Sequence, residues 1–420
     1  MKVCVIGNGG REHALAWRLS ISPSVTKVYA IPGSAAMSDC AELVGIDWQQ
    51  SDHLIRFLKD NHVDLVVVGP EAPLVAGLAD VLNKAGIPVF GPSKVAAQLE
   101  GSKVFAKDLM KKYNIPTAAY GVFHKVDEAK EFIAQTGAPI VVKADGLAAG
   151  KGVVVAMTIE EANAAVEDML SGNRFGDAGS TVVIEEFMEG EEASLLAFVD
   201  GKTVVPMIAS QDHKRIFDGD KGPNTGGMGT YAPAPVLTDT LRDEAMKTIL
   251  EPMVAAMQKE GMPYVGCLYA GLMITPQGPK VVEFNARFGD PETQVVLPLL
   301  DSDLGQIMMA CATGTLTADM VKWKDSSAAC VILASKGYPE TSSKGDVIHG
   351  DIKQHDTTIV FHSGTKLIGD EYVTNGGRVL GVVGLGKDLR TALDRAYGRI
   401  EHIDFEGMQY RTDIGAKAFK

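Results

Sequence analysis

Three polar side chains near residue 283 have the types and the spacing of a metal-phosphate site. The run from Val281 to Glu292 reads VVEFNARFGDPE, so Glu283, Asn285 and Arg287 alternate with apolar residues. Alternate side chains of an extended strand project from one face. That face would present a carboxylate and an amide oxygen, which suit Mg²⁺ together with phosphate and water, and an arginine that could hold an anion. A half-exposed strand with polar residues turned to solvent is the simpler alternative.

A second candidate is a glycine-rich loop between two β-branched strands. Lys143 ends the first strand, and the loop after it contains Gly146, Gly150, Lys151 and Gly152. The tip of such a hairpin can close over phosphates that flanking lysines neutralise. A P-loop would need wider glycine spacing, a hydroxyl residue and a following helix, so the sequence excludes a P-loop NTPase. A glycine-rich hairpin without a ligand is the alternative.

The first predicted strand ends in a glycine turn, residues 7–10, that opens a helix. Amide groups at such a turn favour a phosphate, which makes Gly9 and Gly10 candidate substrate contacts. A dinucleotide fingerprint would have a third glycine where Glu12 stands, and the second strand ends without an acid for a ribose hydroxyl. The sequence therefore disfavours a nicotinamide oxidoreductase. A tight turn that binds nothing is the alternative for this segment.

Two further segments could complete a nucleotide and substrate site. A predicted strand from residue 181 passes into an acidic hinge whose backbone could meet an adenine edge, while Glu192 could accept both ribose hydroxyls. Acidic clusters in loops are usually solvated, which is the alternative. Residues 211–231 are predicted to form a long, donor-rich binding loop. His213 has no partnered Ser, Cys or Asp pattern around it, so no catalytic triad is assigned. The candidates in these segments are Glu185, Glu186, Phe187, Met188, Asp212, Lys214, Asn224, Thr225 and Gly226.

The elements that must position these residues follow a βαβ rhythm over the first hundred residues. Short β-branched runs at 3–6, 27–30 and 65–68 alternate with helical patterns. This rhythm predicts an open parallel sheet whose ligands lie at the carboxyl ends of the strands. Changes of pattern near residues 100 and 325 predict three domains, 1–100, 101–325 and 326–420. Helices are predicted over 75–85, 126–136, 238–260, 304–313 and 389–400.

The composition is that of a globular chain in a reducing compartment. With 46% hydrophobic and 22% charged residues, the 420-residue chain has no apolar run long enough to span a bilayer. No export signal is visible, and five scattered cysteines without a Cys-x-x-Cys pair argue against zinc and disulfides. We therefore expect a cytoplasmic location. A net charge of −13 without a basic run disfavours nucleic-acid partners.

Taken together, the motifs resemble the ATP-grasp superfamily of carboxylate-amine ligases. The combination of the 7–14 turn, the 69–74 turn, the 143–152 hairpin, the 223–229 loop and the 283–292 run resembles one member family, the phosphoribosylamine–glycine ligases. The likeness spans nearly the whole chain. It implies an α/β protein: an ATP-grasp fold preceded by an open parallel, Rossmann-like N-terminal domain, with a small lid subdomain at about 121–190 and a C-terminal α+β domain.

The resemblance also implies a reaction and its participants. ATP, glycine and 5-phosphoribosylamine would give glycinamide ribonucleotide, ADP and phosphate through glycyl phosphate, a step of purine biosynthesis. The implied partners are these small molecules alone, without nucleic acid or membrane, and the protein is expected to be a monomer. The resemblance implies that Glu283 and Asn285 bind Mg²⁺ or Mn²⁺, and that Lys103 and Lys143 bind phosphate under a flap formed by residues 146–152. It implies adenine binding by residues 185–188, ribose binding by Glu192, and catalysis by Asp212, Lys214 and Arg287. The implied substrate-binding residues are Gly9, Gly10, Asn224, Thr225, Gly226 and Asp290.

Two other functions remain open at this level. One is another ATP-grasp enzyme that uses formate or bicarbonate in place of glycine. The other is a nucleotide-sensing module that binds ATP without turnover. The intact face of Glu283, Asn285 and Arg287 argues against a sensor, because a sensor need not keep a metal for chemistry.

Overall fold

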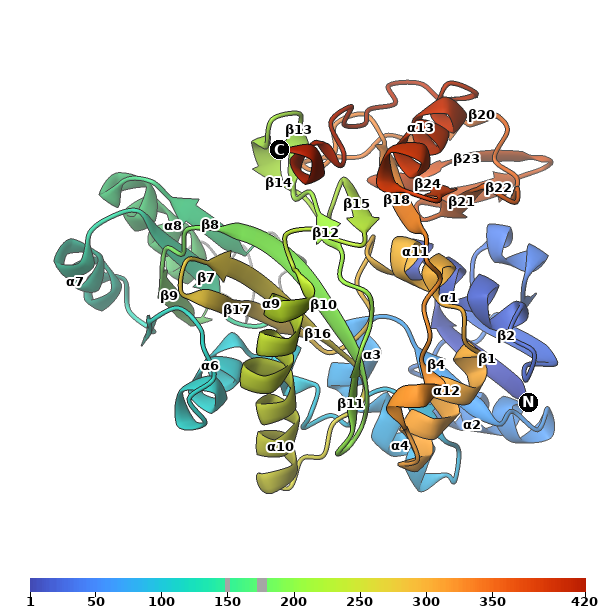
Figure 1. The fold of residues 1–420 in the computed structure, drawn as a ribbon, viewed down its shortest axis with the longest axis horizontal. Helices are drawn as coiled ribbons and strands as arrows, with labels where there is room; N and C mark the ends of the chain where they lie inside the picture. Colours follow the sequence, from blue (N-terminus) through green and yellow to red (C-terminus); the bar gives the residue numbers. More distant parts are fainter. Residues whose placement is uncertain (148–151, 172–179) are drawn as a thin grey trace.

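The computed structural model describes residues 1–147, 152–171 and 180–420. Figure 1 shows a parallel-sheet unit in blue at the N-terminus, a central antiparallel sheet in green to gold, an outlying unit in teal, and a C-terminal unit in orange to red. Gly150 and Lys151, two predicted nucleotide contacts, lie outside the described residues. Among the residues described, no helix is both long and apolar enough to cross a membrane.

The N-terminal sheet is parallel throughout and has the strand order β3-β2-β1-β4-β5. Its elements are β1 (Lys2–Gly7), α1 (Gly10–Ser20), β2 (Lys27–Pro32), a 3-10 turn (Ala35–Asp39), β3 (Glu42–Leu43), α2 (Ser51–Asp60), β4 (Leu65–Val68), α3 (Glu71–Ala76), α4 (Leu78–Lys84) and β5 (Val89–Phe90). Alternate residues of β1 enter two different cores, so both faces of the sheet are covered. The predicted open parallel sheet is confirmed. The helix predicted over 75–85 is interrupted at Gly77, whose φ is +97°.

The central sheet is antiparallel, with the order β11-β10-β16-β17. Its strands are β10 (Glu191–Asp200), β11 (Val204–Pro206), β16 (Val265–Thr275) and β17 (Gly278–Asn285). The helix predicted over 238–260 is present as α9 (Asp239–Ala245), a π-helical turn (Met246–Leu250) and α10 (Glu251–Lys259). A bulge between β16 and β17 shifts the predicted alternation: Val281, rather than Val282, joins Phe284 and Ala286 in the core.

The outlying unit, which we call the lid, has its own small core. Its antiparallel sheet has the order β6-β9-β7-β8, and α7 and α8 pack on one face of it. The elements are β6 (Tyr120–Phe123), α7 (Val126–Thr136), β7 (Ile140–Ala144), β8 (Val153–Ala156), α8 (Ile159–Ser171) and β9 (Val182–Glu186). The short helices α5 (Gln98–Gly101) and α6 (Lys103–Lys112) connect the N-terminal unit to the lid. The predicted hairpin of β7 and β8 is confirmed.

The C-terminal unit shares a sheet with a segment from the middle of the chain. The order is β12-β15-β18-β24-β21, and α13 packs on β24 and β18 (Figure 1). Its elements are β12 (Gln211–Asp212), β15 (Gly229–Ala232), β18 (Ser327–Ala334), β21 (Thr358–His362), β24 (Arg378–Gly386) and α13 (Leu389–Ile400). The smaller elements around it are β13 (Arg215–Phe217), β14 (Lys221–Asn224), α11 (Thr293–Val296), β19 (Lys344–Val347), β20 (His349–Gly350), β22 (Thr365–Ile368), β23 (Glu371–Asn375) and β25 (Ile403–Asp404). The helix α12 (Leu304–Thr313) instead packs against β10, β16 and β5.

The long loop predicted over 211–231 is therefore wrong. The segment forms two short hairpin strands, β13 and β14, and two strands, β12 and β15, that extend the C-terminal sheet. Its side chains also pack, because Met228 and Tyr231 are fully buried. Pairing of β15 with β18 supplies the hydrogen bonds that the glycine-rich sequence does not reveal.

The central sheet should carry a large share of the stability. Leu196 on β10 is fully buried, so Leu196→Ala should lower the free energy of unfolding by about 2–5 kcal/mol. Leu367→Ala, at a leucine that is 41% exposed, should change it by less than about 0.5 kcal/mol. Guanidinium unfolding followed by circular dichroism measures both variants. Equal destabilisation by the two would contradict the assigned core.

Candidate active site

One cavity of about 380 Å³ gathers most of the predicted site residues from α6, the lid, the central sheet, the 214–226 segment and the residues that follow β17. Those that line it are Lys103, Lys143, Gly146, Glu185, Glu192, Lys214, Asn224, Thr225, Gly226, Glu283, Asn285, Arg287 and Asp290. A second hollow of about 420 Å³ lies at the edge of the N-terminal sheet. Its only lysine and glutamate, Lys27 and Glu42, pair with each other at 2.7 Å, so the first cavity is the better candidate.

Several predicted residues do not line the cavity, namely Gly9, Gly10, Gly152, Glu186, Phe187, Met188 and Asp212. Asp212 is nevertheless joined to it through Lys214. The amide of Gly9 donates to Glu12 at 2.8 Å, so the chain's own carboxylate occupies part of the predicted anion cradle. Gly10 instead faces Ser363 and Gln294, which approach the position that a Cβ would take.

Glu283 and Asn285 lie on the same face of β17, as the sequence predicts. The Asn285 amide donates to Glu283 at 3.5 Å, and among the described residues its carbonyl oxygen accepts no hydrogen bond. Burial acts to raise the pKa of Glu283, but Lys143, Lys214 and Lys103 outweigh it and the pKa is lowered. In the described parts of the chain no cation comes within ion-pair distance of this carboxylate. An ionised carboxylate beside an open amide oxygen fits a divalent cation.

Glu185 holds two lysines against the floor of the cavity. Its carboxylate oxygens lie 3.0 Å from Lys143 Nζ and 3.0 Å from Lys107 Nζ, and Glu185 and Lys107 are each 3% exposed in their side chains. Burial lowers the pKa of Lys107 to about 8, although Glu185 acts in the opposite direction. Lys143 also donates to the carbonyl of Val282 at 3.1 Å, across from the lid to β17. Glu185 therefore orients the cationic wall of the cavity.

Lys103 lies under the start of the glycine loop. Its Nζ donates to the carbonyl of Gly146 at 2.9 Å, and its backbone amide donates to Asp145 at 2.6 Å. Asp145 and Ser102 together satisfy free amides at the N-terminus of α6. This tether fixes the base of the loop against the helix that carries Lys103.

Arg287 is held by two carboxylates that the sequence reasoning missed. It lies 2.8 Å from Glu100 and 3.4 Å from Glu71, and Glu71 also lies 3.9 Å from Arg11. Burial opposes the charge on Arg287, but Glu100 and Glu71 outweigh it and the pKa is raised. Arg11 and Glu71 lie in the first turns of α1 and α3, the helices that follow the carboxyl ends of β1 and β4. The N-terminal unit thus contributes both signs of charge to the cavity.

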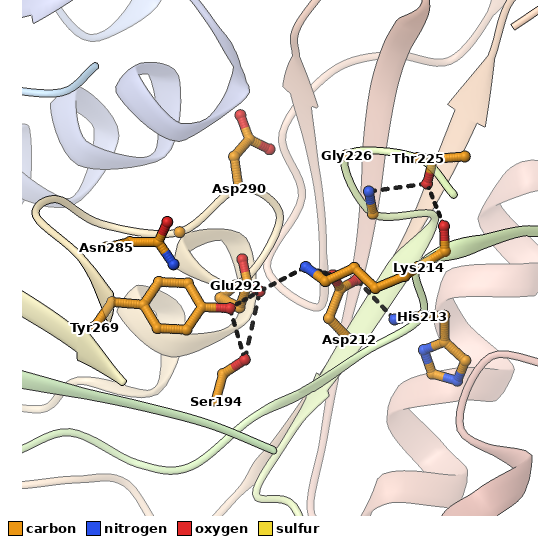
Figure 2. Close-up of polar contacts among 12 residues, drawn as sticks. Ser194, Asp212, His213, Lys214, Thr225, Gly226, Tyr269, Asn285, Asp290 and Glu292 are labelled. Carbon is orange, nitrogen blue, oxygen red and sulfur yellow. Dashed lines mark hydrogen bonds and ion pairs between the residues drawn. The ribbon is translucent and has the colours of Figure 1, made fainter. Parts of the chain in front are cut away.

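Lys214, which lines the cavity, extends between two carboxylates (Figure 2). Its Nζ lies 2.5 Å from Asp212 and 3.8 Å from Glu292. Burial opposes the charge on Lys214, but Asp212, Tyr269 and Glu292 outweigh it and raise the pKa. Glu292 is the last acid of the 283–292 run, yet its spacing gave no reason to assign it a role.

The predicted donors at 224–226 are partly used inside the protein. The Thr225 hydroxyl donates to the carbonyl of Lys214 at 2.8 Å, and the amide of Gly226 donates to the Tyr338 hydroxyl at 3.1 Å. Arg378, from β24, donates to the carbonyl of Gly226 at 2.9 Å and to that of Asp290 at 2.8 Å. The C-terminal unit therefore fixes this loop against the cavity.

We expect Glu185→Gln to weaken both folding and nucleotide binding. The change leaves two buried lysines without their partner, and breaking a buried ion pair costs about 3–5 kcal/mol. Guanidinium unfolding and titration with ADP measure the two effects. Glu189→Gln, at an exposed glutamate on the following loop, is the control and should alter neither. Unchanged ADP affinity in Glu185→Gln would contradict the orienting role.

Comparison with known families and structures agrees with this arrangement. Profiles of phosphoribosylglycinamide synthetase match residues 1–100 (N domain), 101–293 (ATP-grasp domain) and 328–417 (C domain). A phosphoribosylamine–glycine ligase from Halalkalibacterium halodurans is 53% identical over 418 residues, covering all of this chain and 97% of the relative. One from Neisseria meningitidis serogroup A is 53% identical over 421 residues, covering 100% and 99%.

Solved structures show the same fold. A phosphoribosylamine–glycine ligase from Thermotoga maritima superposes with a TM-score of 0.86 at 34% identity, covering 99% of this chain and all of that one. The biotin carboxylase domain of a Hydrogenobacter thermophilus 2-oxoglutarate carboxylase, solved with MgADP and bicarbonate, has a TM-score of 0.75 at 17% identity, covering 97% and 91%. The second likeness concerns the fold alone. Identity above one half along its full length shows that the chain belongs to the phosphoribosylamine–glycine ligase family.

Proposed function

We propose that this protein joins glycine to 5-phosphoribosylamine with hydrolysis of ATP, through a glycyl phosphate intermediate. The observation that carries the proposal is the meeting of Glu283 and Asn285 with Lys143 in one cavity of a chain that belongs to this ligase family. The reaction is the ATP-dependent second step of purine biosynthesis.

Glycine needs activation because a carboxylate resists attack by an amine. In the proposed course, a carboxylate oxygen of glycine attacks the γ-phosphorus of ATP and ADP leaves. The amine nitrogen of phosphoribosylamine then attacks the acyl carbon, phosphate leaves and the nitrogen releases a proton. Phosphoryl transfer of this kind depends on positioning and charge neutralisation more than on a protein nucleophile.

The nucleotide would lie between the lid and the central sheet. Lys103 and Lys143 would neutralise its phosphates, the 146–152 loop would cover them, residues 185–188 would contact the adenine, and Glu192 would accept the ribose hydroxyls. Support comes from the position of Lys103, Lys143, Gly146 and Glu192 around one cavity. The side chain of Glu185 is already bound to two lysines, so its contribution to adenine would come from its backbone.

ATP-grasp enzymes use Mg²⁺ or Mn²⁺ with ATP, and Glu283 and Asn285 are the residues that would hold the ion here. When bound, the ion would supply positive charge to the phosphates. Asp212, Lys214 and Arg287 would orient the reacting carboxylate and phosphate groups. Asn224, Thr225, Gly226 and Asp290 would surround the amine substrate, with Gly9 and Gly10 at its phosphate.

The proposed domain limits are 1–100, 101–325 and 326–420, with the lid at about 121–190. The separate core of the lid and the three family profiles support this division. We also propose a monomer that works in the cytoplasm on small molecules alone. All five cysteines are free, which accords with a reducing compartment.

The proposal predicts ADP release that requires ATP, glycine and phosphoribosylamine together. Omission of each substrate in turn should abolish turnover, and bicarbonate or formate should not replace glycine. Release of ADP with bicarbonate or formate in place of glycine would identify a different ATP-grasp activity, and binding of ATP without turnover would identify a sensor.

Glu283→Ala should reduce turnover by about 100-fold or more, since it removes a charged group from the site of phosphoryl transfer. A coupled ADP assay with varied Mg²⁺ or Mn²⁺ measures the loss, and Glu189→Ala serves as the matched control. Normal turnover by Glu283→Ala would remove the basis for the metal assignment.

A further inference from the structure

Two hydroxyl groups lie directly behind Glu292, on the side away from Lys214 (Figure 2). The Tyr269 hydroxyl, from β16, donates to Glu292 Oε1 at 2.6 Å. The Ser194 hydroxyl, from the neighbouring strand β10, lies 2.8 Å from the Tyr269 oxygen and 3.5 Å from Glu292 Oε1.

The direction of this hydrogen-bond chain follows from counting protons. A tyrosine hydroxyl has one proton, and Tyr269 donates it to the carboxylate of Glu292. Ser194 must therefore be the donor in its contact with Tyr269. Chains of donors that end on a carboxylate polarise one another and fix its orientation. Ser194 and Tyr269 are each 5% exposed and Glu292 is 1% exposed, so water does not compete for these bonds.

The packing around Glu292 leaves the carboxylate little freedom. A Cβ at Gly289 would overlap Glu292 and approach the Tyr269 ring, so glycine is required for the carboxylate to lie here. On the open side Glu292 lies 3.8 Å from Lys214 Nζ, an ion-pair contact that is longer than a hydrogen bond. Asp212 holds the same amine at 2.5 Å.

Asp212 and Glu292 interact with Lys214 in different ways. Asp212 bonds directly to Lys214, whereas Glu292 Oε1, which accepts from Tyr269, lies 3.8 Å from the amine and attracts it from a distance. Lys214, whose side chain is 38% exposed, keeps protons free to meet an anionic group in the cavity. Without the two hydroxyls, the orientation of Glu292 Oε1 would no longer be fixed from this side.

We propose that Tyr269 and Ser194 are positioning residues that hold Glu292, and through it Lys214, in the geometry needed to receive the glycine carboxylate. The inference rests on the proposed function, because it takes glycine as the substrate that meets Lys214. It adds two residues that act on Lys214 through Glu292: Tyr269, which lines the cavity, and Ser194, which lies behind Tyr269.

A pH profile separates this role from a structural one. Glu292 must be ionised to attract Lys214. Burial raises the pKa of Glu292, although Lys214 and the hydrogen bond from Tyr269 act to lower it. Loss of that bond raises the pKa further, so the acidic limb of activity should move to higher pH. The titratable and charged groups that face Glu292 are Tyr269, Lys214, Asp212, Arg287 and Arg378.

The decisive variant is Tyr269→Phe. It should lower kcat/KM for glycine by about 10- to 100-fold, the range expected for one hydrogen bond to a charged group, and shift the acidic limb upward. The dissociation constant for ADP should stay within about twofold, because the nucleotide lysines are held by Glu185 instead. Ser194→Ala should show the same pattern with a smaller change.

Tyr264→Phe is the matched control. Tyr264 is also fully buried, and its hydroxyl donates to the backbone carbonyl of Cys267, away from the cavity. It should lower the melting temperature as Tyr269→Phe does, but leave the glycine kinetics and the pH profile unchanged. The double variant with Glu292→Gln should be no slower than Glu292→Gln alone, because Tyr269 acts through Glu292.

The outcomes distinguish the two claims. An active wild-type enzyme with glycine kinetics unchanged in Tyr269→Phe, or additive effects of Tyr269→Phe and Glu292→Gln, would overturn the positioning role alone. A wild-type protein whose ADP release does not depend on glycine would overturn the proposed function, and the inference with it.

Discussion

Lys143 joins the two sheets that enclose the cavity. It leaves β7 of the lid, pairs with Glu185 on β9 and donates to the carbonyl of Val282 on β17. Val282 immediately precedes the Glu283 and Asn285 face, so one side chain sets the distance between the lysines proposed to bind phosphate and the candidate metal ligands. A second link runs beside it, because Lys107 donates to Thr117 and Thr117 donates to the carbonyl of Val281. Both links begin at the carboxylate of Glu185.

The cavity is built from cations that the chain's own acids hold in place. Glu185 holds Lys143, Asp212 holds Lys214 and Glu100 holds Arg287, while Glu283 has no protein cation as its partner among the described residues. The whole chain carries a net charge of −13 and should repel anions at long range. Salt limits that repulsion to about 8 Å at physiological ionic strength. Binding of anionic substrates therefore depends on the local electrostatic field of the cavity. That field comes from lysines and arginines that acidic side chains already hold in position.

Local patterns were sufficient to predict the chemistry-bearing strand, the lysine-flanked hairpin and the parallel sheet. Glu283 and Asn285 are two residues apart, and Lys143 and Gly146 share one hairpin, so their proximity needs no knowledge of the fold. Glu71, Glu100, Ser194 and Tyr269 each lie on an ordinary helix or strand, and only tertiary packing brings them to the cavity. Residues 211–231 looked like a loop because the partner of β15 is β18, about one hundred residues later in the chain. The bulge that exchanges Val281 for Val282 has no local sequence mark either.

The sheet shared by β15 and β18 joins two parts of the chain that the family profiles assign to different domains. A chain ended near residue 325 would keep β12 and β15 but lose β18, so one side of β15 would present unpaired amide and carbonyl groups to solvent. Unpaired strand edges of this kind can pair with other chains and so promote aggregation. The C-terminal unit thus covers the edge of β15 in the folded protein. Its removal would expose an aggregation-prone strand edge and would not release a catalytic fragment that folds on its own.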